Sequence, residues 1–245
     1  MRPQEAAEFA FCLRGARFRW PGQERDILDI PFFSAGPGER IFISGPSGSG
    51  KSTLLSLIAG ILCPSAGEVS VNGRCLSALT GAERDIFRGE HIGFIFQQFN
   101  LIPYLSILDN VLLPCRFSPE RRGKAEKQAG SAPLAAQNLL EQLDLPSPLW
   151  KRQVTRLSVG QQQRVAAARA LIGGPAMIMA DEPTSSLDAD HRKVFLRLLL
   201  EECRAAGSTL LFVSHDHSLA EEFSVTVKLA ELNRAACPEE NRGAP

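Results

Sequence analysis

The chain has 245 residues, of which 44% are hydrophobic and 22% charged, and its 27 basic side chains balance 27 acidic ones. These values are typical of a globular protein with a substantial core in one domain, and they exclude a chain that is disordered throughout. A formal net charge of zero gives no bulk electrostatic support to a nucleic-acid partner, so none is expected.

Cysteine spacing and the N-terminal sequence indicate a cytoplasmic protein. No cysteine pair has the spacing of a zinc site or of a disulfide framework, so we expect reduced thiols. The first residues include acids where a signal peptide has a basic start, and no stretch approaches the roughly 20 apolar residues of a membrane span. We therefore expect no direct insertion into a membrane. The cysteines are Cys12, Cys63, Cys75, Cys115, Cys203 and Cys237.

The first part of the chain predicts strands around a glycine-rich loop, followed by a helix. Strand patterns occur at residues 9–18, 27–33, 40–44, 68–71 and 91–96. Leucine and isoleucine at helical spacing predict a helix over residues 51–62, directly after the glycine-rich loop.

Residues 98–158 differ in character from the sequence around them. Residues 100–115 hold two prolines among apolar residues, and residues 116–133 are polar, basic and typical of a loop. Residues 134–145 have apolar positions at helical spacing, which predicts an amphipathic helix. We therefore expect a helical lobe that is inserted into a surrounding core.

Helices and strands alternate in the last part of the chain. A helix is predicted over residues 161–172, an apolar strand over 176–180, a leucine-rich helix over 190–205 and a second apolar strand over 209–214. Continuous apolar strands that alternate with helices indicate a parallel sheet covered on both faces. The polar residues 233–245 are expected to form a flexible tail.

Residues 45–52 read GPSGSGKS, which is the spacing of a phosphate-binding loop. Glycines let successive backbone N–H groups point at phosphate oxygens, and the helix that follows adds its positive N-terminal end. Lys51 would reach the β- and γ-phosphates, and the Ser52 hydroxyl would bind Mg²⁺. The loop alone leaves kinases, GTPases, motor proteins and transport ATPases open. The expected contacts are Gly45, Pro46, Ser47, Gly48, Ser49, Gly50, Lys51, Ser52 and Thr53.

Acidic residues follow the predicted strand at 176–180. Carboxyl ends of parallel strands meet at one edge of a sheet, so Asp181 and Glu182 would lie beside the phosphate-binding loop. There Asp181 would hold Mg²⁺ through water, and Glu182 would act as general base for the attacking water. His215 follows the strand at 209–214 and would contact the γ-phosphate. Taken singly, each has a structural alternative, either a capped strand end or a satisfied structural histidine.

Residues 157–164, LSVGQQQR, resemble the signature motif of the ATP-binding cassette (ABC) family. Gln97 follows a strand and resembles the glutamine of the family's Q-loop, and residues 185–188 (SSLD) resemble the D-loop. His215 stands at the position of the switch histidine. Trp20 stands where the family has an aromatic residue that stacks on adenine.

The resemblance covers about residues 9–230 and implies an α/β fold. This fold has a P-loop NTPase core of mostly parallel sheet flanked by helices, an N-terminal antiparallel β subdomain and an inserted α-helical lobe. The implied nucleotide-binding domain spans residues 1–232, with its core at 1–97 and 159–232 and the lobe at 98–158.

The resemblance also implies ATP hydrolysis with Mg²⁺ by two domains that meet head to tail. A second ABC ATPase subunit, expected to be a second copy, would complete each ATP site. Ser158 and the N–H group of Gly160 would bind the γ-phosphate across the interface, and Gln161 and Asp188 are also expected to bind the nucleotide. The residues expected to carry catalysis are Lys51, Gln97, Glu182 and His215, and those expected to bind Mg²⁺ are Ser52, Gln97 and Asp181.

The sequence departs from the family pattern at three places. Val159 replaces the more usual glycine of the signature motif, whereas Gly160 is kept. Trp20 replaces the commoner tyrosine and offers a stacking surface at least as large. Residues 228–234 lack the Asp-Gly turn of many relatives, which puts the last strand in doubt.

Residues 97–111 are similar to the exporter subgroup that includes lipoprotein-releasing, macrolide-export and cell-division ATPases. In the family this surface receives a helix of an integral-membrane permease, and Phe99 and Tyr104 suit such a groove, unless they pack inside the lobe. The expected function is the ATPase subunit of an exporter or extruder, peripheral on the inner face of the cell membrane through its permease. The alternatives are a mechanical or regulatory ATPase that drives a membrane partner without transport, and an ABC ATPase with no membrane partner.

Overall fold

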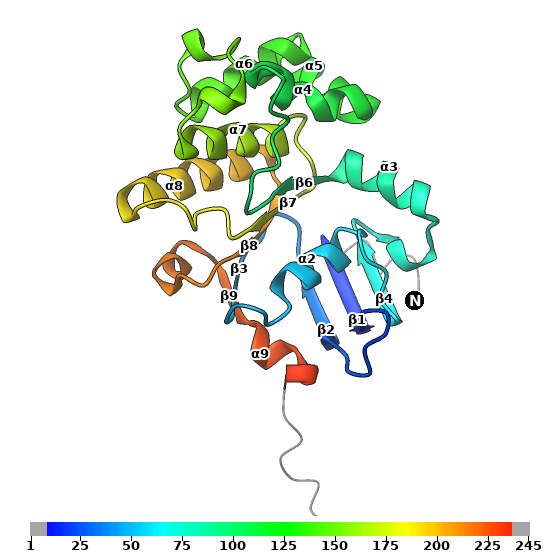
Figure 1. Cartoon of the computed structure of the whole chain (residues 1–245). Coiled ribbons are helices and arrows are strands. Elements are labelled where there is room, and N and C mark those ends of the chain that lie inside the picture. The colour runs from blue at the N-terminus through cyan, green and yellow to red at the C-terminus, as the bar shows by residue number, and fades with distance from the viewer. Residues whose placement is uncertain (1–8, 237–245) are drawn as a thin grey trace, which may run out of the picture.

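The computed structural model describes residues 9–236, which form two β-sheets and a set of helices (Figure 1). The first sheet is antiparallel and has the strand order β2-β1-β4-β5, which confirms the expected β subdomain. Its register pairs Phe18 with Leu28, so the loop that carries Trp20 closes this end of the hairpin. The strands are β1 (Phe11–Phe18), β2 (Leu28–Ala35), β4 (Ala66–Val71) and β5 (Arg74–Cys75).

The second sheet is parallel and has the strand order β6-β7-β8-β3-β9. Its buried strands send alternate side chains into two hydrophobic cores. In β7, Met177 and Met179 face one core and Ile178 faces the other. This alternation confirms a parallel sheet covered on both faces. The strands are β3 (Arg40–Ser44), β6 (Ile92–Ile95), β7 (Met177–Asp181), β8 (Thr209–Val213) and β9 (Val225–Lys228).

Helices cover both faces of the parallel sheet (Figure 1). Helix α2 packs in the core shared with the antiparallel sheet, whereas α7 and α8 pack in the core shared with the lobe, which consists of α4, α5 and α6. No helix within residues 9–236 combines the length and apolar character that a bilayer crossing requires. The α-helices are α2 (Lys51–Ile58), α3 (Gly81–His91), α4 (Ile107–Phe117), α5 (Pro119–Ala129), α6 (Ala132–Gln142), α7 (Val159–Leu171), α8 (Ala189–Ala206) and α9 (Leu229–Leu232). Short 3₁₀ helices are η1 (Leu76–Ala78), η2 (Ser147–Leu149), η3 (Val154–Arg156), η4 (His217–Glu222) and η5 (Arg234–Ala236).

Helix α5 corrects the expectation of a loop at residues 116–133. The helix begins at the N-cap Ser118, whose hydroxyl accepts a hydrogen bond from the Arg121 N–H, and Pro119 follows at the first position. Along its exposed side, Lys124 and Glu120 form an ion pair four residues apart. The cap and the ion pairs stabilise this helix. Its apolar residues are too few for their spacing to predict a helix from the sequence.

Helix α3 is a second element that the hydrophobic pattern did not predict. Its N-terminus is a capping box, in which the Thr80 N–H donates to the Glu83 carboxylate at 2.8 Å and the Thr80 hydroxyl accepts from the Glu83 N–H. By contrast, α2 ends at Ile58 rather than at residue 62, because Gly60 takes a left-handed backbone with φ 67°.

The chain end also differs from expectation. The last strand, which the missing Asp-Gly turn put in doubt, is present as β9 and pairs in parallel with β3. Asn233, expected to start a flexible tail, is buried; it accepts a hydrogen bond from the Asp29 N–H at 2.8 Å and donates one to the Ile27 carbonyl at 2.9 Å. The rest of the expected tail, from residue 237 onward, lies outside the described residues.

Candidate functional site

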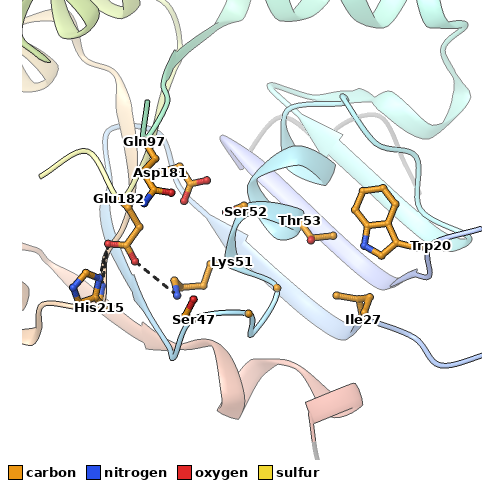
Figure 2. Close-up of a pocket in the computed structure, with 12 residues that line it drawn as sticks. Trp20, Ile27, Ser47, Lys51, Ser52, Thr53, Gln97, Asp181, Glu182 and His215 are labelled. Carbon is orange, nitrogen blue, oxygen red and sulfur yellow. Dashed lines mark hydrogen bonds and ion pairs between the residues drawn. The ribbon is translucent and has the colours of Figure 1, made fainter. Parts of the chain in front are cut away.

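A cavity of about 620 Å³ opens where β6, β7 and β8 end, beside the loop between β3 and α2 (Figure 2). A cavity of this size suits a small-molecule ligand. The parallel sheet brings these segments together because its strands end at a common edge. All lining residues except Ile27 are residues that the sequence predicts for the site. They are Trp20, Ile27, Ser47, Gly48, Gly50, Lys51, Ser52, Thr53, Gln97, Asp181, Glu182 and His215.

The loop between β3 and α2 turns on two left-handed glycines. Gly48 has φ 78° and Gly50 has φ 98°, which are conformations that other residues rarely adopt. Gly50 is the N-cap of α2, where no side chain caps the helix and the first turn holds no acidic residue. The first N–H groups of α2 are therefore available to an anion at the positive end of the helix.

Lys51 lies buried across the same loop. Its Nζ donates hydrogen bonds to the carbonyl oxygens of Gly45 at 2.8 Å and Pro46 at 2.9 Å, and it lies 3.8 Å from Glu182 Oε1. These contacts hold a cation in the middle of the cavity, between Glu182 and Trp20 (Figure 2). A phosphate bound there would accept a charge-assisted hydrogen bond from the ammonium group.

Asp181, Ser52 and Gln97 line one part of the cavity (Figure 2). Asp181 Oδ1 is buried, and no described residue forms a hydrogen bond with it. Burial raises the pKa of Asp181, the Ser52 hydroxyl opposes this shift and the Glu182 carboxylate adds to it. Carboxylate, hydroxyl and amide oxygens are ligands that Mg²⁺ accepts. A buried carboxylate oxygen without a hydrogen-bond donor beside such groups therefore fits a magnesium ion.

Glu182 and His215 form a pair at the end of the cavity opposite Trp20 (Figure 2). Glu182 Oε2 lies 2.8 Å from His215 Nδ1 and accepts a second hydrogen bond from the His215 N–H at 3.4 Å. The side chain of Glu182 is 12% exposed and that of His215 is 66% exposed. Glu182 has a left-handed backbone with φ 46°, a strain of about 1–2 kcal/mol for a residue with a side chain. The pair therefore consists of a Glu182 carboxylate that hydrogen bonds keep in place and a His215 imidazole that is accessible from outside.

Trp20 and Ile27 form the other end of the cavity (Figure 2). The Trp20 indole is partly exposed and meets Phe18 edge-on, with ring centroids 4.9 Å apart and an interplanar angle of 87°. Ile27 is the lining residue that the sequence did not predict, since no motif includes it. Its N–H donates to the Phe18 carbonyl at 2.8 Å, which brings it across the hairpin toward Trp20. An aromatic face beside an aliphatic side chain suits a flat ring such as a purine.

Residues predicted from the signature motif and the D-loop do not line the cavity. Ser158 caps α7, where its hydroxyl accepts from the Gln161 N–H at 3.3 Å and its own N–H donates to Gln161 Oε1 at 3.1 Å. Asp188 caps α8 and accepts from the His191 N–H at 3.0 Å. These side chains therefore have structural roles within the chain. The predicted residues outside the cavity lining are Gly45, Pro46, Ser49, Ser158, Gly160, Gln161 and Asp188.

Gly160 lies in the first turn of α7 beside Leu187. A Cβ atom added at Gly160 would have Leu187 Cδ2 as its nearest neighbour at 3.6 Å, which is an ordinary contact. The neighbouring Val159 is exposed. Nothing in residues 9–236 therefore requires glycine at this position, so a need for glycine would come from a ligand or a second molecule.

The two aromatic residues expected in a docking groove lie in different environments. Phe99 is buried in the core of the lobe, which is the alternative that the sequence left open for it, and not in a groove; Tyr104 is 75% exposed. A groove of about 300 Å³, here called the α3–α4 groove, lies between these helices beside β6. Its lining residues are Asp85, Arg88, Gly89, Ile92, Gly93, Phe94, Phe96, Asn100, Leu113, Pro114, Phe117, Arg121, Arg169 and Ala170.

Comparisons with known proteins find relatives of this chain in both sequence and structure. A family model described as "ABC transporter" matches residues 29–185. An uncharacterized ABC transporter ATP-binding protein of Mycobacterium tuberculosis is 40% identical over 86% of this chain and 82% of its own length. The lipoprotein-releasing system ATP-binding protein LolD of Syntrophotalea carbinolica is 37% identical over 84% of this chain and 87% of its own. The ATP-binding cassette MJ0796, solved as a dimer in a post-hydrolysis state with ADP and Pi, superimposes with a TM-score of 0.77 at 33% identity, over 94% of this chain and 97% of that one.

Proposed function

The chain belongs to the ABC transporter family, and from this premise we propose how its cavity binds and hydrolyses ATP. The adenine ring would lie against Trp20 and Ile27, and the phosphates would lie along the N-terminal end of α2. The observation that carries the proposal is the order of side chains along one cavity, with Trp20 at one end, Lys51 in the middle and the Glu182–His215 pair at the other (Figure 2). This order matches the base, the phosphates and the attacking water of ATP hydrolysis.

Glu182 is the proposed general base. Its Oε2 is held by His215 and its Oε1 faces Lys51, so the carboxylate is oriented to accept a proton from a water molecule that attacks the γ-phosphorus. The water oxygen forms a bond to phosphorus as the bond to the leaving ADP oxygen breaks. Lys51 and the first N–H groups of α2 stabilise the negative charge on the phosphate oxygens. His215 orients the base and is accessible to the γ-phosphate.

Ser52, Gln97 and Asp181 are the proposed ligands of the Mg²⁺ that accompanies ATP. When bound, the ion neutralises charge on the phosphate oxygens. Asp181 Oδ1 supports this role because it is buried and makes no hydrogen bond with a described residue.

We propose that two copies of the chain complete each other's ATP site. Ser158 and Gly160 lie outside the cavity, at the N-terminal end of α7. The capping box pairs the N–H groups of Ser158 and Gln161, which leaves those of Val159 and Gly160 for an anion from another molecule, with space for close approach at Gly160. In the assembled dimer these residues would meet the γ-phosphate held by the partner subunit, with Gln161 and Asp188 beside it. The relative solved as a dimer with ADP and Pi supports the proposal that two copies pair.

We further propose that the α3–α4 groove receives a helix of a separate membrane permease, which would hold the protein on the cytoplasmic face of the membrane. The groove contains Phe94, Phe96 and the 82%-exposed Phe117, and such apolar walls suit the apolar face of a helix. Export is the favoured direction because a relative functions in a lipoprotein-releasing system, as its name states. The alternative is an ATPase that changes its membrane partner's conformation without transport.

Replacing Glu182 with glutamine tests the proposed site. The amide does not accept the proton as the carboxylate does, so hydrolysis should fall by at least about 100-fold while ATP still binds. ATP should then hold the variant as a dimer, seen by size-exclusion chromatography. Glu222→Gln, which alters an exposed carboxylate outside the cavity, is the control and should hydrolyse ATP normally. Hydrolysis at the wild-type rate in Glu182→Gln would remove Glu182 as the base.

A further inference from the structure

The residue Gln97 belongs to a tight turn directly after β6. The Phe99 N–H donates to the Phe96 carbonyl at 2.9 Å and closes the turn. Phe99 and Asn100 then take consecutive left-handed backbones, with φ 59° and 48°. A bulky residue such as Phe99 is strained in this region and asparagine less so, so the surrounding structure must hold Phe99 in particular. Residues 96–100 are called the Gln97 turn below.

Arg169 forms hydrogen bonds with the C-terminal end of the Gln97 turn. Its guanidinium donates to the carbonyl oxygens of both strained residues, Phe99 at 2.5 Å and Asn100 at 2.6 Å. The guanidinium is largely desolvated, which lowers its pKa. None of the ion pairs among residues 9–236 includes Arg169. Its contacts therefore fix backbone geometry, for which a planar fork of donors is suited.

The helix that carries Arg169 is fixed against the strand that precedes the turn. A Cβ atom added at Gly93 of β6 would lie 2.2 Å from the carbonyl oxygen of Ala170, so β6 and α7 pack in direct backbone contact. Ala170 is the next residue after Arg169. The Gln97 turn therefore follows one element and is hydrogen-bonded to another, and these two elements are close-packed against each other.

We propose that Arg169 is a positioning residue that holds Gln97 in the ATP cavity and ties it to helix α7. The inference rests on the proposed role of Gln97 in binding Mg²⁺. Ser158 is the N-cap of α7 and Gly160 lies in its first turn, where both would meet the partner's ATP, and Arg169 lies near the other end of the helix. Arg169 and Asn100 also line the α3–α4 groove. A helix docked in that groove would therefore touch the contact that sets Gln97.

Arg169→Lys keeps the positive charge but replaces the planar fork with a single ammonium group, which cannot hold both carbonyls in the same geometry. We expect kcat for ATP hydrolysis to fall about tenfold or more, because small misplacements of catalytic groups have effects of this size. The Mg²⁺ concentration for half-maximal activity should rise. KM for ATP should stay within about twofold, since Trp20 and Lys51 are untouched.

Two comparisons distinguish a positioning role of Arg169 from a general loss of structure: the same substitution in a Gln97→Ala chain, and a matched control variant. If Arg169 acts through Gln97, Arg169→Lys should change kcat by less than about twofold in a Gln97→Ala chain. The control is Arg84→Lys, because Arg84 on α3 also donates to a carbonyl outside its helix, that of Leu79, at 2.7 Å, and lies outside the ATP cavity and the signature motif. An equal fold-loss in both backgrounds, or an equal loss in Arg84→Lys, would overturn the proposal.

Amide hydrogen exchange tests the positioning without hydrolysis. The Phe99 N–H should exchange faster in Arg169→Lys and at the wild-type rate in Arg84→Lys. Asn100→Gly should restore part of kcat to Arg169→Lys, because glycine adopts a left-handed backbone without strain. Unchanged exchange would overturn the proposal. Faster exchange with normal hydrolysis by Gln97→Ala would keep the positioning role and refute only the function proposed for Gln97.

Discussion

Alanine at Gly160 is expected to stabilise the isolated chain and to weaken its activity. The nearest atom to the added Cβ is Leu187 Cδ2 at 3.6 Å, so the methyl group fits without rearrangement. Alanine in a helix is more favourable than glycine by about 0.5–1 kcal/mol. For a chain of this length, that gain raises Tm by about 1–4 °C. In the assembled dimer, however, the methyl group would stand where the partner's γ-phosphate approaches the Gly160 N–H group.

Gly123→Ala is the matched control, because Gly123 lies inside α5 and an added Cβ there would have no neighbour within 4 Å. Thermal unfolding followed by circular dichroism, without nucleotide, should show a rise in Tm for both variants. ATP hydrolysis should fall at least about tenfold in Gly160→Ala only. In a Glu182→Gln background, ATP should give a dimer with Gly123→Ala and a monomer with Gly160→Ala. Wild-type hydrolysis by Gly160→Ala would refute the idea that a phosphate on another subunit meets this residue.

Two further changes test the metal ligand and the groove. Asp181→Asn should raise Tm of the nucleotide-free, Mg²⁺-free chain at neutral pH, because burial raises the pKa of Asp181 and disfavours its charged form. The protonated carboxyl group favours the folded state below the ordinary aspartate pKa, and this stability is lost as pH rises through the folded-state pKa. The rise in Tm caused by Asp181→Asn should therefore be smaller in acid than at neutral pH. A Tm of Asp181→Asn below that of the wild type at neutral pH would contradict this reasoning. Phe117→Asp should prevent a tagged chain from copurifying with a permease from detergent-extracted membranes, whereas Phe32→Asp, on an exposed part of β2, should not; equal recovery would argue against the groove.

The sequence predicted most of the cavity lining because short motifs determine it. The pattern at residues 45–52 specifies both the left-handed glycines and the start of α2. Asp181 and Glu182 follow a strand that is apolar throughout, so their place at the edge of a parallel sheet follows from strand direction alone. Ile27 has no comparable signal, since it reaches the cavity only through the register of the β1–β2 hairpin.

Other features of the structure depend on contacts between segments that are distant in the chain, so the sequence did not predict them. Phe99 looks like a surface aromatic residue in the sequence, yet the left-handed Gln97 turn directs it into the core of the lobe. Asn233 is polar and lies near the chain end, but the backbone of residues 27–29 gives it buried hydrogen-bond partners. Helix α5 was missed because its stability comes from a cap and ion pairs, which hydrophobic periodicity does not register.

The left-handed backbone of Glu182 has an evolutionary consequence. Glutamate at φ 46° is strained, whereas glycine adopts this geometry freely and asparagine or aspartate adopts it more readily than most residues. Glycine at this position would relieve a strain of about 1–2 kcal/mol, whereas the contacts of the carboxylate with Lys51 and His215 favour glutamate. Backbone strain therefore opposes glutamate at the one position where the proposed hydrolysis requires it. In a duplicated gene released from selection for hydrolysis, only these side-chain contacts would oppose the loss of Glu182.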